Sequence, residues 1–222
     1  TTLTMSQVTD ANYLSATATA TLTVAKAAPS VTFSDVTKTY GDSDFALSAT
    51  SSNTSAFTYT SSDPTVATIT GSTVTIVGAG TATLTMSQVA DANYLSATAT
   101  ATLTVAKAAP SVTFSDVTKT YGDADFALST TSSNTSAVIY TSSDPSVATV
   151  SGSTVTITGA GTTTITMTQV ADANYTAAIA TATLTVAKAA PAVTFANISK
   201  VYGDAPSNFA YNSQSLGSVT YS

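Results

Sequence analysis

The sequence predicts an all-β fold, a tandem array of β-sandwiches with about seven short strands in each repeat. Three observations predict it. Apolar residues alternate with Thr or Ser along short segments, which is the period of a half-buried strand. Gly, Pro, Asp and Asn separate these segments at intervals of about 8–12 residues, the spacing typical of a sandwich. The whole pattern recurs at a constant offset along the chain, and no segment shows a helical period.

The expected strands can be placed in order along one repeat. The first two are 31–33 and 36–40, and the alternation slips between them at Ser34 and Asp35, so we expect a bulge or a switch between sheets there. Alternation is then regular in the later strands, which are expected at 45–49, 57–59, 73–76, 82–86 and 97–105. The residues expected to face the core are Val31, Phe33, Phe45, Leu47, Val74, Ile76, Leu84, Met86, Leu103 and Val105.

Repeated motifs give the domain organisation. A Lys-Ala-Ala-Pro segment begins at Lys26, Lys107 and Lys188, so the numbering of the repeats has a constant period of 81. The two complete repeats that end at Lys107 and Lys188 differ at only 14 positions. The chain is therefore expected to be a window from a longer array. The expected domains are the C-terminal part of a repeat at 1–26, complete repeats at 27–107 and 108–188, and the N-terminal part of a divergent repeat at 189–222.

The composition excludes several classes of function. Thr, Ala and Ser supply 119 of the 222 residues, and Cys, His, Trp, Arg and Glu are absent. A chain without Cys and His has no disulfides, no Cys/His zinc site and no catalytic histidine. With 6 Lys, 12 Asp and a net charge of −6, we expect no nucleic-acid partner. No apolar stretch approaches the ~20 residues of a membrane span, so we expect no membrane insertion in this segment.

Catalytic motifs are also missing, and we expect the protein not to be an enzyme. Aspartic-protease chemistry uses two facing Asp-Thr/Ser-Gly loops, and the sequence contains no such tripeptide. Serine chemistry would need a Lys as its base, yet no Ser lies in a Gly-x-Ser-x-Gly elbow.

Two paired carboxylates are the best metal candidates. Asp42 and Asp44 follow a Gly turn, and the pair recurs as Asp123 and Asp125, so these side chains could offer oxygen ligands to Ca²⁺. The pair is broken in the last repeat, where Asp204 is followed by Ala and Pro. The alternative is a turn Asp followed by a solvated Asp, with no metal and no other cofactor. The Asp-Ala-Asn-Tyr segments are interpreted similarly, as turns whose Asx side chains cap their own backbone.

The joints between repeats contain no Gly and no flexible Gly/Ser run. Pro110 fixes its own φ and favours an extended conformation at Ala109, so the last strand of one repeat is expected to run nearly straight into the next. The sequence thus predicts repeats arranged end to end as a semi-rigid rod.

The ordered motifs resemble a known family. Each repeat contains Tyr-Gly-Asp, Phe-Ala-Leu-Ser, Ser-Ser-Asp-Pro, Gly-Ser-Thr-Val-Thr-Ile, Gly-Ala-Gly-Thr and Leu-Thr-Val-Ala-Lys-Ala. This set resembles the bacterial immunoglobulin-like tandem repeats of large surface adhesins, including those of gliding Bacteroidetes.

The resemblance implies immunoglobulin-like sandwiches, secretion to the bacterial cell surface, and a structural stalk that bears force and projects a distal binding region. The expected partners are the neighbouring repeats and a distal ligand of unknown identity. The family shares no catalytic site, so no functional residue is carried over. The alternative is a module that itself binds a glycan or a partner protein through its loop ends. Glycan sites usually expose aromatic rings, whereas Trp is absent here and most Tyr alternate inward.

Overall fold

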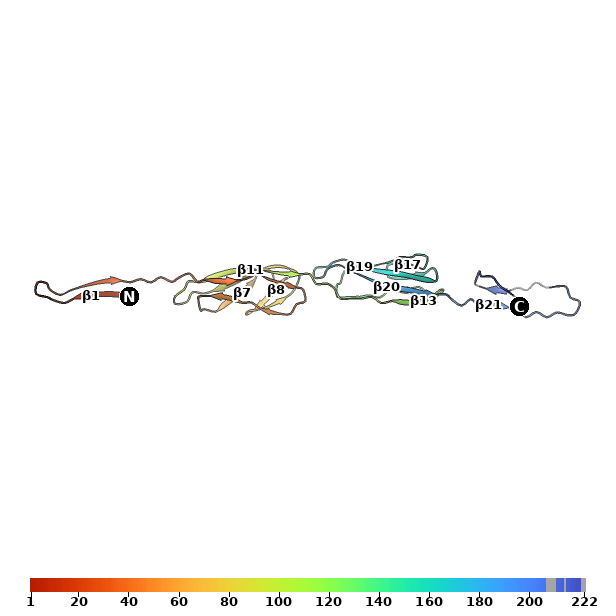
Figure 1. Ribbon diagram of the computed structural model, residues 1–222, viewed down its shortest axis with the longest axis horizontal. Helices are drawn as coiled ribbons and strands as arrows, with labels where there is room; N and C mark the ends of the chain where they lie inside the picture. Colours follow the sequence, from red (N-terminus) through yellow and green to blue (C-terminus); the bar gives the residue numbers. More distant parts are fainter. Residues whose placement is uncertain (207–210, 214, 221–222) are drawn as a thin grey trace. The chain divides into compact units, whose positions relative to one another are not determined.

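The computed structural model describes residues 1–206, 211–213 and 215–220 (Figure 1). The regular secondary structure of these residues is all strand, which confirms the predicted fold class. The described residues contain no helix that could cross a membrane. The chain divides into two compact units, which are described separately below. The first comprises Thr1–Ala108 with Ala173–Thr176, and the second comprises Ala109–Asp172 with Ala177–Ser222.

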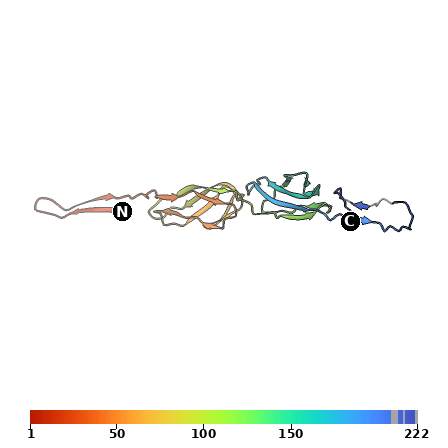
Figure 2. The same cartoon turned by 45° about the vertical axis from the view of Figure 1, so that its right-hand side comes forward.

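The first unit contains a sandwich of two layers (Figure 2). One layer is a four-stranded sheet in the order β4 (Val36–Thr39), β11 (Ala97–Ala106), β10 (Gly80–Gln88) and β7 (Phe57–Ser61). The other contains the pair β3 (Val31–Phe33) and β6 (Ala49–Ser51), and the sheet β5 (Phe45–Ala46), β9 (Thr73–Ile76) and β8 (Ala67–Thr70). If β5 and β6 are taken as one interrupted strand, the strand order is that of an immunoglobulin-like sandwich.

The second unit contains the same arrangement. Its four-stranded sheet has the order β13 (Val117–Thr120), β20 (Ala178–Ala187), β19 (Gly161–Gln169) and β16 (Val138–Ser142). Opposite lie the pair β12 (Val112–Thr113) and β15 (Thr131–Ser132), and the sheet β14 (Phe126–Ala127), β18 (Thr154–Ile157) and β17 (Ala148–Ser151). The 14 sequence differences between the repeats therefore leave the strand order unchanged.

Short hairpins account for the remaining strands. In the first unit β1 (Thr2–Gln7) pairs with β2 (Ala16–Thr21), and all their residues are exposed. Their sequences match parts of β10 and β11, where alternate residues are buried. In the second unit β21 (Val193–Phe195) pairs with β22 (Tyr211–Ser213).

The core of the first sandwich follows the predicted alternation. Leu84, Leu103 and Val74 are fully buried and meet between the layers. Of the other residues expected to face inward, Leu47, Met86 and Val105 are buried. The rest are half-buried, namely Val31, Phe33, Phe45 and Ile76. The core also uses small residues that the prediction did not include, among them Ala67, Ala82 and Ala101.

The outer face of β10 and β11 carries hydroxyl side chains. Opposed residues on this face are Thr81 with Thr104, Thr83 with Thr102, and Thr85 with Thr100. β-branched Thr fits a pleated surface, and its hydroxyl group remains available to water. The alternation therefore separates a dry inner face from an uncharged polar outer face.

The chain changes sheets at Ser34 and Asp35, which is one of the two outcomes expected from the slipped alternation. β3 pairs with β6 in one layer, whereas β4 runs parallel to β11 in the other. At the switch the Thr102 backbone N–H donates to Asp35 Oδ1 over 2.6 Å. Thr183 N–H donates to Asp116 Oδ1 over 2.7 Å in the second repeat. In β11 this N–H lies one residue before the segment that pairs with β4. In β20 it likewise lies one residue before the segment that pairs with β13. The carboxylate thus supplies an acceptor where the strand pairing stops.

We expect Asp35→Ala to destabilise the first sandwich by about 1 kcal/mol, because Thr102 N–H loses a charged acceptor. Urea denaturation, followed through NMR signals of residues 27–107, measures this change. Ser34→Ala is the matched control, since its side chain is exposed and lies beside the same switch. An unchanged urea midpoint for Asp35→Ala would contradict the role given to the carboxylate.

Candidate functional site

Asp42, the first calcium candidate, belongs to a tight turn. Asp42 N–H donates to Thr39 O over 3.0 Å, and Thr39 N–H donates to Asp42 Oδ2 over 2.9 Å. Gly41 has a φ of +90°, a conformation that disfavours any residue with a Cβ. Gly122, the equivalent residue of the second repeat, has a similar φ of +93°. The Tyr-Gly-Asp motif is therefore explained by the geometry of this turn.

Asp44 has a different partner from Asp42. Its Oδ2 accepts a hydrogen bond from Thr75 Oγ1 of β9 over 2.9 Å. Asp125 accepts from Thr156 Oγ1 over the same distance. The paired carboxylates are thus used separately, one in its own turn and one across the sheet. No group of three acidic, His or Cys residues that could hold a metal occurs within the described part of the chain. Calcium binding at these residues stays a prediction.

The Asp-Ala-Asn-Tyr loop is ordered by its first residue. Asp91 Oδ1 accepts hydrogen bonds from the N–H groups of Asn93 over 2.8 Å and Tyr94 over 2.7 Å. This is the capped turn that the sequence predicted. The second oxygen, Oδ2, accepts from Thr54 N–H over 3.1 Å, a contact between loops far apart in the sequence. One side chain therefore fixes two loops at this end of the sandwich.

Hydrogen bonding lowers the pKa of Asp91 below its ordinary value. The main causes are the backbone N–H groups of Thr54 and Tyr94, which stabilise the carboxylate form. The pKa of Asp63 is lowered chiefly by the Thr65 hydroxyl, and that of Asp144 by the Ser146 hydroxyl. These carboxylates stabilise turns in their ionised form.

Two buried amides lie beneath the same loops. Asn53 and Gln88 are each only 3% exposed. Asn53 Nδ2 donates to Val89 O over 2.8 Å and to Leu95 O over 3.2 Å, and Gln88 Nε2 donates to Asn53 O over 2.9 Å. The amides thus satisfy backbone carbonyls where the strands end, which a buried loop requires.

Sequence reasoning missed this amide network, although one signal was present. Gln88 continues the inward parity of Leu84 and Met86 in β10, so a polar residue occupies a core position. Its Oε1 atom is buried without a partner in the described part of the chain. In the second repeat Ser132 Oγ donates to the equivalent oxygen of Gln169 over 2.7 Å. Ser51 occupies the equivalent position in the first repeat.

The joint residues are also hydrogen-bonded. Ala27 N–H donates to Asn93 O over 2.9 Å, and Leu95 N–H donates to Ala27 O over 2.9 Å. The Lys26 ammonium donates to Asp91 O over 2.6 Å. The segment before Pro29 is therefore held by the Asp-Ala-Asn-Tyr loop on both sides, and it is not a free linker.

The side chains of this region form hydrogen bonds that fix the conformation of the loops. The hydrogen bonds of Asp42, Asp91, Asn53 and Gln88 described above join neighbouring turns or strand ends. Lys38, on the edge strand β4, places its ammonium 4.9 Å from the centroid of the Phe45 ring, a cation–π contact. The site therefore gives the sandwich defined ends.

No family model matches the sequence. No curated protein matches it either. Among solved structures, the chain is similar to Drosophila N-cadherin EC1-4, with 15% identity and a TM-score of 0.34 over 72% of this chain and 50% of that chain. It is similar to Sidekick-1 immunoglobulin domains 1-5, with 15% identity and a TM-score of 0.35 over 85% and 45%. The chain is also similar to domains 4 and 5 of the S-layer protein SbsC, with 21% identity and a TM-score of 0.29 over 59% of this chain and 76% of that chain. The match spans about half the length of the N-cadherin and Sidekick-1 chains.

We expect a chelator to leave the melting temperature unchanged, because Asp42 and Asp44 already have separate protein partners. Differential scanning calorimetry with and without EDTA, and again with added Ca²⁺, makes the comparison. A fall of several degrees on chelation would show a bound structural ion, since a ligand that binds only the folded state stabilises it. Asn substitutions at all four positions, namely Asp42, Asp44, Asp123 and Asp125, would then remove the calcium effect.

We expect stability to fall as the pH drops below about 4. The pKa of Asp91 is lower in the folded chain than its ordinary value of 3.8, so ionised Asp91 favours folding above that value. This contribution is lost as the pH falls through the lower folded-state pKa. Asp91→Asn should reduce the acid sensitivity of the first sandwich. NMR titration of the Asp91 carboxyl carbon provides the direct measurement, and an ordinary pKa there would contradict the explanation.

Proposed function

We propose that this chain is a structural, force-bearing module of a long adhesin stalk on the bacterial cell surface, where it projects a distal binding region. The resemblance of the motifs to adhesin repeats, those of gliding bacteria included, supports the bacterial and extracellular setting. The absence of Cys, His and any serine elbow in the sequence fits a role without catalysis. The neighbouring repeats are its proposed partners.

The parallel pairing of β4 with β11 carries the proposal. Residues 36–39 pair in register with 103–106, and β4 and β11 lie near the two ends of the repeat sequence. Since the strands are parallel, the start of β4 and the end of β11 lie at opposite ends of their ladder. A force that pulls the ends of the repeat apart therefore acts along the strands and shears several hydrogen bonds together.

The joint adds to this argument. Ala27 makes two backbone hydrogen bonds to the Asp-Ala-Asn-Tyr loop, so tension reaches the sandwich through an ordered segment. Pro29 further restricts the backbone after the joint. We propose that repeats joined in this way form the semi-rigid rod expected from the sequence.

Single-molecule pulling tests the proposal through two prolines in β4. Tyr40 N–H donates to Ala106 O over 2.8 Å, and donors alternate along a parallel ladder, so Lys38 N–H also faces β11. Lys38→Pro should lower the unfolding force of the first repeat. The second repeat, which keeps Lys119, serves as a reference in the same trace.

Thr37→Pro is the matched control, because its N–H faces away from β11 on an edge strand. Lys38→Ala separates the cation–π contact with Phe45 from the backbone effect. Equal unfolding forces for the repeats in Lys38→Pro would show that the ladder does not resist tension. Unfolding of native repeats at negligible force would contradict the stalk role.

A further inference from the structure

A docked loop within the first unit provides a template. The loop Ala173–Thr176 belongs to this unit. Asn174 Oδ1 accepts a hydrogen bond from Ala79 N–H over 2.9 Å. The ring of Tyr175 meets that of Tyr40 edge to face, with centroids 5.4 Å apart and planes at 84°. An amide acceptor and an aromatic ring thus recognise a backbone donor and a second ring.

The backbone of the same loop is fixed to the joint. Ala108 N–H donates to Asn174 O over 2.9 Å, and Thr176 N–H donates to Ala108 O over 2.9 Å. Gly78 allows the close approach, because a Cβ there would lie 2.7 Å from Thr65 O and 3.3 Å from Asn174 Oδ1. We call the surface formed by Tyr40, Gly78, Ala79 and Ala108 the socket of the first unit.

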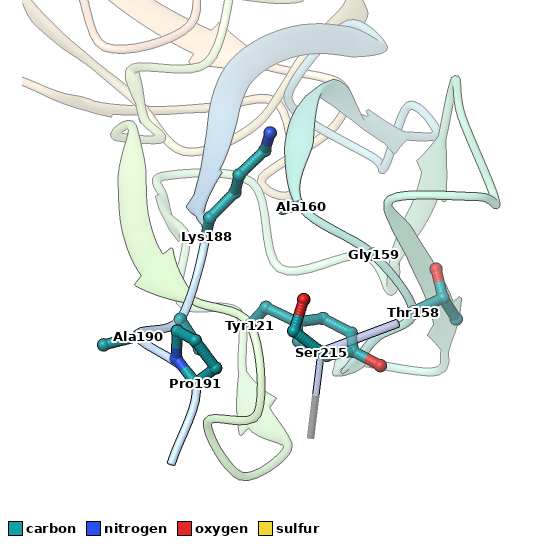
Figure 3. A pocket seen from close by; sticks show the side chains of 9 residues that line it. Tyr121, Thr158, Gly159, Ala160, Lys188, Ala190, Pro191 and Ser215 are labelled. Carbon is teal, nitrogen blue, oxygen red and sulfur yellow. The ribbon is translucent and has the colours of Figure 1, made fainter. Parts of the chain in front are cut away.

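The second unit has the same socket, and no Asp-Ala-Asn-Tyr loop lies in it among the residues that the structure describes. Tyr121, Gly159, Ala160 and Ala189 occupy the positions of the next repeat that are equivalent to the four socket residues. All four line one pocket of about 460 Å³, and Lys188 and Pro191 of the joint and Ser215 line it as well (Figure 3). In the view of Figure 3 the Tyr121 side chain extends from the side of Pro191 toward Thr158, and Ser215 overlaps it.

The binding groups of this pocket are unused. Within residues 1–206, 211–213 and 215–220, the N–H groups of Ala160 and Ala189 have no hydrogen-bond acceptor. Tyr121 is 51% exposed. Gly159, like Gly78, leaves no room for a side chain, since a Cβ there would lie 2.5 Å from Ser146 O. Two backbone donors, one open aromatic ring and a glycine that permits close approach therefore recur together.

We propose that this pocket binds an Asp-Ala-Asn-Tyr loop, carried by the repeat that begins at Ala189. Asp172 lies one repeat period of 81 residues beyond Asp91, and the proposed loop begins one further period beyond Asp172. Its Asn side chain accepts a hydrogen bond from Ala160 N–H, and its Tyr ring packs on Tyr121. Its backbone forms hydrogen bonds with the N–H and C=O groups of Ala189, as the loop at Asn174 does with Ala108. The docking holds whether the array is a stalk or binds ligands itself, because it depends only on the repeat period and the socket.

Amide hydrogen exchange in the 222-residue chain gives the first measurement. Ala79 should exchange at least about tenfold more slowly than Ala160, because only Ala79 N–H has an acceptor. Asn174→Ala should remove this difference, whereas Asn174→Asp, which keeps an acceptor oxygen, should preserve it. Asn93→Ala is the matched control, since Asn93 is the equivalent residue of the first repeat. Equal exchange at Ala79 and Ala160 in the native chain would overturn the template.

The decisive measurement uses the full chain with a second copy of residues 108–188 inserted after Lys188. The pocket at Tyr121 then precedes a complete repeat with its own Asp-Ala-Asn-Tyr loop. Ala160 exchange should slow by about tenfold, to the level of Ala79. Asn→Ala in the inserted loop alone should reverse that slowing. Unchanged exchange at Ala160, or slowing that survives the Asn→Ala change, would overturn the proposal.

Folding of the inserted repeat is monitored in the same spectra. Its Val155 and Leu184 positions are buried in a core formed by that repeat alone, so their methyl signals report on folding independently of docking. A folded inserted repeat with fast exchange at Ala160 counts against the proposal. Tyr121→Ala, which removes only an exposed ring, should weaken the protection of Ala160 while those methyl signals persist.

Discussion

Burial of alternate side chains in β10 and β11 is the interaction on which each sandwich depends. These two strands lie at the centre of the four-stranded sheet and supply Leu84, Met86 and Leu103 to the core. The second layer covers the inner face of these strands and removes their apolar surface from water.

Polar side chains complete the hydrogen bonding wherever the strand ladders stop. Asp35 accepts an N–H at the sheet switch, Asp91 fixes the loops at one end, and Asn53 and Gln88 satisfy carbonyls underneath. Each replaces a partner that a regular ladder would supply. In a chain with only 12 carboxylates, several of the Asp residues thus have structural positions that a count of charges does not reveal.

Much of the fold was predictable, because it follows from local alternation. The sheet switch at Asp35 and the inward positions of Leu84 and Leu103 follow from a period of two. The side-chain acceptor for Thr102 did not, since 67 residues separate it from Asp35. The partners of Asp44 and Gln88 were likewise set by contacts between distant strands. The docked loop at Tyr175 depends on residues from two repeats, which no pattern within one repeat specifies.

The opposed Thr residues on the outside of β10 and β11 have a consequence for the medium in which the protein can work. Dissolved salt shortens the Debye length and weakens the repulsion between charged surfaces. Hydroxyl groups bind water by hydrogen bonds that this screening does not reach. A surface with Thr85 opposite Thr100, in a chain with only 18 charged residues, therefore depends less on ionic strength than a surface of charged side chains would.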